Sequence, residues 1–90
     1  MAKAIWTDQA ITDVVEIVGW ISADKPFTAA RIAEELLDNG NRLDLFPGRG
    51  RAISHGRREL VILPPYLIRY RIEGDQVTIL EVRHAARRPT

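Results

Sequence analysis

The side chains best suited to chemistry in this 90-residue sequence are arginines and one histidine in its second half. A guanidinium group stabilises negative charge that develops on a phosphate, and histidine is the side chain that exchanges a proton near neutral pH. Together they could carry acid–base and electrostatic catalysis at a phosphate. The residues available for this role are Arg51, Arg58, Arg69, Arg83, His84 and Arg87, of which Arg51, Arg58, His84 and Arg87 are the catalytic candidates.

These candidates also have structural interpretations. Arg51 and Arg58 could pair with Glu59 or Glu81 across strands, which is worth only about 0.2–1 kcal/mol for an exposed pair. His84 could hydrogen-bond the backbone where the last strand ends. Because the sequence shows no partner that would orient its ring, we favour this interpretation of His84 over a catalytic one.

The charge of the chain is divided between its halves. Four basic and eight acidic side chains give residues 1–48 a net charge of −4, whereas nine arginines and four acidic side chains give residues 49–90 a net charge of +5. The last lysine is Lys25. This separation predicts an acidic partner for the second half. The partner-binding candidates are Arg69, Arg71, Arg83 and Arg87.

Length and composition indicate one domain, residues 1–90, in the cytoplasm. The hydrophobic content of 46% and the charged content of 28% are ordinary for a globular protein. The sequence lacks cysteine, so disulfides and thiolate metal sites are excluded, and we expect no metal or cofactor. It also lacks an apolar run long enough to cross a bilayer and the apolar region of a signal peptide.

Hydrophobic periodicity predicts a strand, two helices and then three strands. Thr7 offers an N-cap for the first helix, and Pro26 fits the first turn of the second. Trp6 and Trp20 are expected in the core or between helices. The predicted elements are a strand at 4–6, a helix at 8–22, a helical stripe from 26 to 43, a turn at 46–50, and strands at 58–63, 66–72 and 76–83.

This order predicts an α+β domain of two layers. The N-terminal strand and an antiparallel helical hairpin would pack on one face of an antiparallel β-sheet. Within residues 66–72, Ile68, Tyr70 and Ile72 point to one face, and Arg69 and Arg71 point to the other. The arginine-bearing face is therefore either solvated or a binding surface.

The chain resembles the RelE/ParE superfamily of bacterial toxins, and the resemblance covers nearly its whole length in the expected order. Its pieces are an opening strand and helix, a proline followed by small and apolar residues in the second helix, a Leu-Phe-Pro-Gly-Arg-Gly-Arg turn, an Arg-Glu-Leu-Val strand, a Tyr-Leu-Ile-Arg-Tyr-Arg-Ile strand, and an ending of the type Val-Arg-His-Ala-Ala-Arg. These lie at residues 5–17, 26–32, 45–51, 58–61, 66–72 and 77–87. The resemblance implies a type II toxin that is held inactive by a cognate antitoxin, with Arg69 and Arg71 in its docking surface.

The resemblance leaves three functions open. Members of the ParE-like branch poison DNA gyrase, members of the RelE-like branch cleave mRNA on the ribosome, and an inert relative would only bind its antitoxin. RelE-like chains often carry an arginine where this sequence has Leu67, lysines and arginines along the sheet, and a C-terminal tyrosine or a histidine. This sequence has leucine at that position, no lysine after Lys25 and no tyrosine in its C-terminal tail, so we favour the ParE-like, gyrase-directed hypothesis over a metal-independent endoribonuclease.

Overall fold

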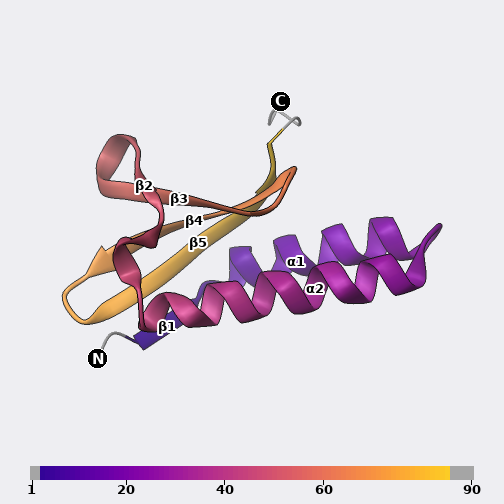
Figure 1. Ribbon diagram of the computed structural model, residues 1–90, viewed down its shortest axis with the longest axis horizontal. Helices are drawn as coiled ribbons and strands as arrows, with labels where there is room; N and C mark the ends of the chain where they lie inside the picture. The colour runs from indigo at the N-terminus through magenta and orange to yellow at the C-terminus, as the bar shows by residue number, and fades with distance from the viewer. Residues whose placement is uncertain (1–2, 86–90) are drawn as a thin grey trace.

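The computed structural model describes residues 3–85 and has two layers, a helical hairpin and a five-stranded sheet (Figure 1). The predicted α+β class and arrangement are confirmed. The elements are β1 (Lys3–Trp6), α1 (Asp8–Ser22), α2 (Pro26–Asn41), β2 (Arg51–Ala52), β3 (Arg57–Leu63), β4 (Tyr66–Glu73) and β5 (Gln76–His84), with short 3-10 helices η1 (Arg42–Asp44), η2 (Pro47–Arg49) and η3 (Ser54–Gly56).

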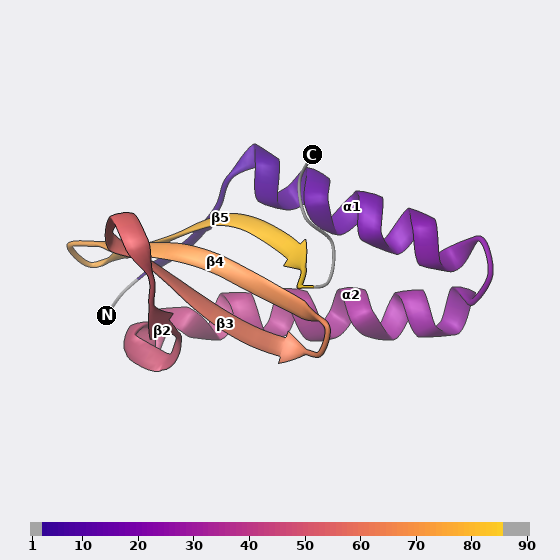
Figure 2. The ribbon, with the colours of Figure 1, turned by 90° about the horizontal axis from the view of Figure 1, so that it is seen from above.

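The two helices begin as the sequence predicts. The backbone N–H of Ala10 donates to Oγ1 of Thr7 at 3.1 Å, which caps α1. Pro26 stands at the first position of α2, where its missing N–H leaves no hydrogen bond unmade. The helices are joined by a short turn, so they lie side by side as an antiparallel pair (Figure 2).

The sheet has the order β1-β5-β4-β3-β2. Neighbouring strands are antiparallel except for β1, which lies parallel to β5 at one edge. The two-residue strand β2 was not predicted, and it pairs with Arg58 and Glu59 at the other edge. Between β4 and β5 the register shifts after Arg69, so that Arg69 faces Glu81 while Tyr70 faces Ile79.

The core lies between the hairpin and the inner face of the sheet. Its largest fully buried side chains are Tyr70, Leu36, Leu43, Ile68, Ile79 and Val77. Trp6 packs against this core and its indole N–H donates to Oδ1 of Asn41 at 2.9 Å. The helical layer contributes Ala10 and Val14 from α1 and Ala29 and Leu36 from α2.

Trp20 lies outside the core, contrary to one of the two positions expected for it. It is 63% exposed and lines a depression together with Thr28 and Ile32 of α2. In Figure 2 the loop end of the hairpin runs past the end of the strands, so the sheet covers this end of α1 only in part.

Candidate functional site

Charged side chains cross the outer face of the sheet in one row. Glu59 accepts from Arg51 (Oε1 to Nη2, 3.0 Å) and from Arg69 (Oε2 to Nε, 3.0 Å). Glu81 accepts from Arg69 (Oε2 to Nη1, 3.5 Å) and from Arg83 (Oε1 to Nη1, 3.3 Å). Two carboxylates therefore partner three of the candidate arginines, and the predicted pairing of Arg51 is confirmed.

Glu59 is the buried centre of this row, at 9% exposure. Burial alone would raise the pKa of its carboxyl group. The hydrogen bonds and positive charges of Arg51 and Arg69 outweigh burial, so its pKa lies below the ordinary value. Glu59 is thus an anion that holds two guanidinium groups in place.

Arg58 does not pair with Glu59 or Glu81, so that part of the prediction is wrong. Neighbouring residues of a strand point to opposite faces, which places Arg58 away from the carboxylates. Its Nη1 donates to the carbonyl oxygen of Gly50 at 2.7 Å and to that of Gly48 at 3.5 Å. Arg58 therefore stabilises the backbone of the loop at residues 48–50.

A second pair of arginines lies on the outer face beyond the row. Arg57 and Arg71 face each other across β3 and β4. Arg57 donates to Ser54, through Nε to the backbone carbonyl at 3.1 Å and Nη2 to Oγ at 3.3 Å, and Arg71 donates to the carbonyl of His55 at 3.2 Å. Within residues 3–85 neither forms an ion pair with a carboxylate. Their positive charge therefore remains unbalanced on this face.

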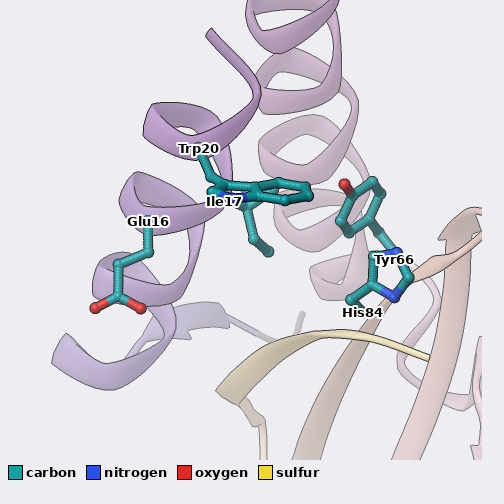
Figure 3. Close-up of a pocket in the computed structure, with 5 residues that line it drawn as sticks. All are labelled: Glu16, Ile17, Trp20, Tyr66 and His84. Carbon is teal, nitrogen blue, oxygen red and sulfur yellow. The ribbon is translucent and has the colours of Figure 1, made fainter. Parts of the chain in front are cut away.

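His84 lies at the end of β5, opposite Tyr66. The two rings meet edge to face, with centroids 5.2 Å apart and planes at 89°. They line a cavity of about 270 Å³ together with Glu16, Ile17 and Trp20, and Figure 3 shows the indole of Trp20 extending from α1 toward Tyr66. The sequence did not indicate that α1 would supply residues to this cavity.

The four catalytic candidates are not gathered in one site. Arg51 lies in the outer row, Arg58 is bonded to the loop at residues 48–50, and His84 lines the cavity beside α1. Arg87 lies outside the described residues. Of the partner-binding candidates, Arg69, Arg71 and Arg83 share the outer face, which the alternation predicted for Arg69 and Arg71.

Among residues 3–85, His, Asp and Glu side chains form no group of three or more that could hold a metal ion. In the same range, each helix is too short or too polar to cross a membrane.

The fold has a counterpart among solved structures. It matches a solved structure described as the chromosomal ParDE TA system from P. aeruginosa with a TM-score of 0.82 over 93% of this chain and 96% of that chain, at 22% sequence identity. At this identity the match establishes the fold.

Sequence comparison establishes the family. Residues 4–89 match the family described as the ParE toxin of the type II toxin-antitoxin system, parDE. Toxin RelE2 of Caulobacter vibrioides is 40% identical over 87 residues, covering 97% of this chain and 99% of that protein. The putative toxin Y4kP of Sinorhizobium fredii is 40% identical over 82 residues, covering 89% and 84%. The chain belongs to the ParE toxin family of the RelE/ParE superfamily, and as a type II toxin it has an antitoxin as its partner.

Proposed function

We propose that this toxin acts by binding DNA gyrase and that it does not cleave RNA. The observation that carries the proposal is the ion-paired row on the outer face. An RNA-cleaving toxin needs guanidinium groups free to meet the developing charge of a phosphorane. Here Arg51, Arg69 and Arg83 already bind Glu59 and Glu81. Recruiting them to phosphate would cost these ion pairs.

The overall charge supports the same proposal. Binding to ribosomal RNA draws much of its affinity from cationic contacts with phosphates. This chain has a formal net charge of only +1 and carries no lysine after Lys25. A protein target does not require such a charge, because apolar contacts and a few ion pairs are sufficient for protein binding.

We also propose that the antitoxin docks on the outer face of the sheet. Six basic and three acidic side chains share this face, which leaves three positive charges for an acidic segment: Lys3, Arg51, Arg57, Arg69, Arg71 and Arg83 against Glu59, Glu73 and Glu81. Arg71 is the strongest contact candidate because, within residues 3–85, its guanidinium donates to the backbone carbonyl of His55 and forms no ion pair. Arg69 and Arg83 contribute from within the row.

RNA cleavage is the second candidate function, favoured by the cavity of Figure 3. A carboxylate, a phenol and an imidazole line it, from Glu16, Tyr66 and His84, and such groups can move protons. One relative, at 40% identity, is named Toxin RelE2, and RelE is the name of the RNA-cleaving branch. The described lining holds no arginine or lysine to stabilise a phosphorane, so we place this candidate second.

Two assays on the purified toxin test the proposal together. In the first, gyrase supercoils a relaxed plasmid with ATP and increasing toxin, and we expect supercoiling to fall. In the second, translating ribosomes carry a labelled mRNA, and we expect the mRNA to stay intact. Cleavage of the mRNA that disappears in His84→Ala, with supercoiling unaffected, would overturn the proposal in favour of the second candidate.

A further inference from the structure

Two large apolar side chains stand exposed where the chain passes from the helical layer to the sheet. The segment between α2 and β2 makes this passage at one edge of the two layers (Figure 1). Within it, Leu45 is 55% exposed and Phe46 is 65% exposed. They line an open depression of about 810 Å³ with Arg42, Pro47, Gly48 and Arg49. We refer to residues 42–49 as the edge loop.

The backbone of the edge loop is held firmly although its side chains are exposed. The buried hydroxyl of Tyr70 donates to the carbonyl of Pro47 at 2.7 Å and accepts from the N–H of Gly50 at 2.7 Å. Arg58 adds its hydrogen bonds to the carbonyls of Gly48 and Gly50. The exposure of Phe46 is therefore built into the fold, because the side chains that fix the loop come from the core and from β3.

The edge loop also carries a net positive charge of one, from Arg42 and Arg49 against Asp44. Arg42 and Arg49 flank the two apolar residues, and Nη1 of Arg49 donates to Oδ1 of Asn39 at 3.1 Å. Over residues 3–85 neither guanidinium forms an ion pair. An exposed aromatic ring beside arginines is the composition of an energetic hot spot in protein–protein contacts. A loop fixed beforehand loses less conformational entropy when it binds.

We infer that the edge loop is the surface with which this toxin contacts its protein target. The complementary site is an apolar pocket for Phe46 and Leu45 with carboxylates at its rim to meet Arg42 and Arg49. This inference rests on the proposed function, in which the target is a protein. It assigns target and antitoxin to different surfaces, because the arginines proposed for the antitoxin lie on the outer sheet face.

The test compares Leu45→Ala/Phe46→Ala with the control Phe27→Ala. Phe27 is 91% exposed in the first turn of α2, so its truncation also removes an exposed ring and leaves the core intact. For the double variant we expect the toxin concentration that halves gyrase supercoiling to rise at least tenfold. For Phe27→Ala we expect it to stay within twofold. Antitoxin affinity, measured by titration calorimetry, should stay within twofold for both.

A charge reversal tests the carboxylate rim. Arg42→Glu should also raise the half-inhibitory concentration at least tenfold, because it would place like charges together. Arg31→Glu is the matched control, since Arg31 is an exposed arginine within α2. It makes the same change in net charge, and we expect less than a twofold effect. If the two reversals had equal effects, inhibition would depend on the overall charge of the toxin. The inference that carboxylates of the target meet Arg42 would then be overturned.

The outcomes separate this inference from the proposed function. If the wild type inhibits gyrase and the double variant inhibits it equally, the edge loop is not the target contact and the gyrase proposal stands. If the double variant loses antitoxin affinity together with inhibition, the loop serves the antitoxin and the inference is overturned. If the wild type leaves gyrase unaffected, the gyrase proposal fails. Growth arrest after induction in cells then tests the inference. If the double variant arrests growth as strongly as the wild type, the inference is overturned.

Discussion

The outer face of the sheet and the edge loop use arginine in opposite ways. On the sheet, Arg51 and Arg69 are bonded to the buried carboxylate of Glu59, so their charges are largely balanced within the molecule. At the edge loop, the backbone is satisfied by Tyr70 and Arg58, while Phe46 remains exposed. The ion-paired row of the outer face therefore uses its arginines for internal order, whereas the edge loop leaves large side chains exposed to a partner.

This difference shows that an arginine count does not locate a functional surface. The sequence suggested phosphate chemistry because arginines are concentrated in residues 49–90. In the structure, some of them are held by carboxylates and others support backbone carbonyls. The surfaces open to a partner are those whose positions are fixed but whose side chains lack an internal counterpart, namely the edge loop and the pair formed by Arg57 and Arg71.

The largest effect on stability is expected at Gly50. A Cβ there would stand 2.6 Å from the Tyr70 hydroxyl oxygen and 2.9 Å from the backbone oxygen of Glu59. Gly50→Ala should therefore lower the free energy of unfolding by about 3 kcal/mol. Gly48→Ala is the control, because a Cβ at that position meets nothing within 4 Å. Urea denaturation measures both, and equal stability of the two variants would disprove the tight anchoring of the loop.

Removing the carboxylate at the centre of the row should have the next largest effect. Glu59→Gln loses the charge that binds Arg51 and Arg69, and we expect a loss of about 2 kcal/mol at neutral pH. Glu81→Gln should lose less, because that carboxylate is 27% exposed rather than 9%. Thermal unfolding of the three proteins at one pH gives the comparison.

The Glu59→Gln variant also tests how stability depends on pH. Because the pKa of Glu59 is lowered in the folded protein, its ionised form stabilises the fold above the ordinary carboxyl value of 4.5. This stabilisation is lost as pH falls below that value through the lowered pKa. The wild type should thus lose more stability than Glu59→Gln between neutral pH and acid. If the stability of the wild type and that of Glu59→Gln fell equally with pH, the ionised carboxylate of Glu59 would not be the stabilising group.

A smaller effect is expected from the hydroxyl that anchors the edge loop. Tyr70→Phe keeps the buried ring and removes the hydrogen bonds to Pro47 and Gly50, at a cost of about 1 kcal/mol. Amide hydrogen exchange at Gly50 should accelerate at the same time. Exchange that is unchanged while stability falls would show that the hydroxyl stabilises the core without holding the loop.

The smallest effect on stability is expected at Arg71, where the effect on the complex should be large. Arg71→Glu should change the free energy of unfolding by less than about 0.5 kcal/mol and weaken antitoxin binding at least tenfold. Arg69→Glu is a poor substitute, since it also breaks the contact with Glu59. If Arg71→Glu left the affinity for the antitoxin unchanged, the antitoxin would not bind on this face of the sheet.

The elements were predictable where local chemistry decides them. The cap at Thr7 and the proline at residue 26 set the beginnings of α1 and α2, and alternation set the faces of β4. The short strand β2 was missed because two exposed residues give no hydrophobic pattern. Its pairing depends on β3, which is a tertiary contact.

The site was less predictable because it depends on register and on where layers end. Whether Arg58 or Arg51 reaches Glu59 is decided by which face each side chain takes after pairing. The exposure of Trp20 depends on how far α1 extends past the strands, and the hydrophobic periodicity of the helix does not reveal this. The edge loop was recognised only as a turn, although two adjacent large apolar residues before a Pro-Gly turn were a signal that could have marked it.

The most direct test of the proposed function is pulse-labelling of growing cells after brief induction of the toxin. Incorporation of labelled thymidine and of labelled methionine is followed in parallel over the first minutes. A gyrase-directed toxin stops thymidine incorporation first, while methionine incorporation continues. Loss of methionine incorporation before thymidine incorporation would contradict the account and would direct attention to His84 and the cavity that it shares with Tyr66.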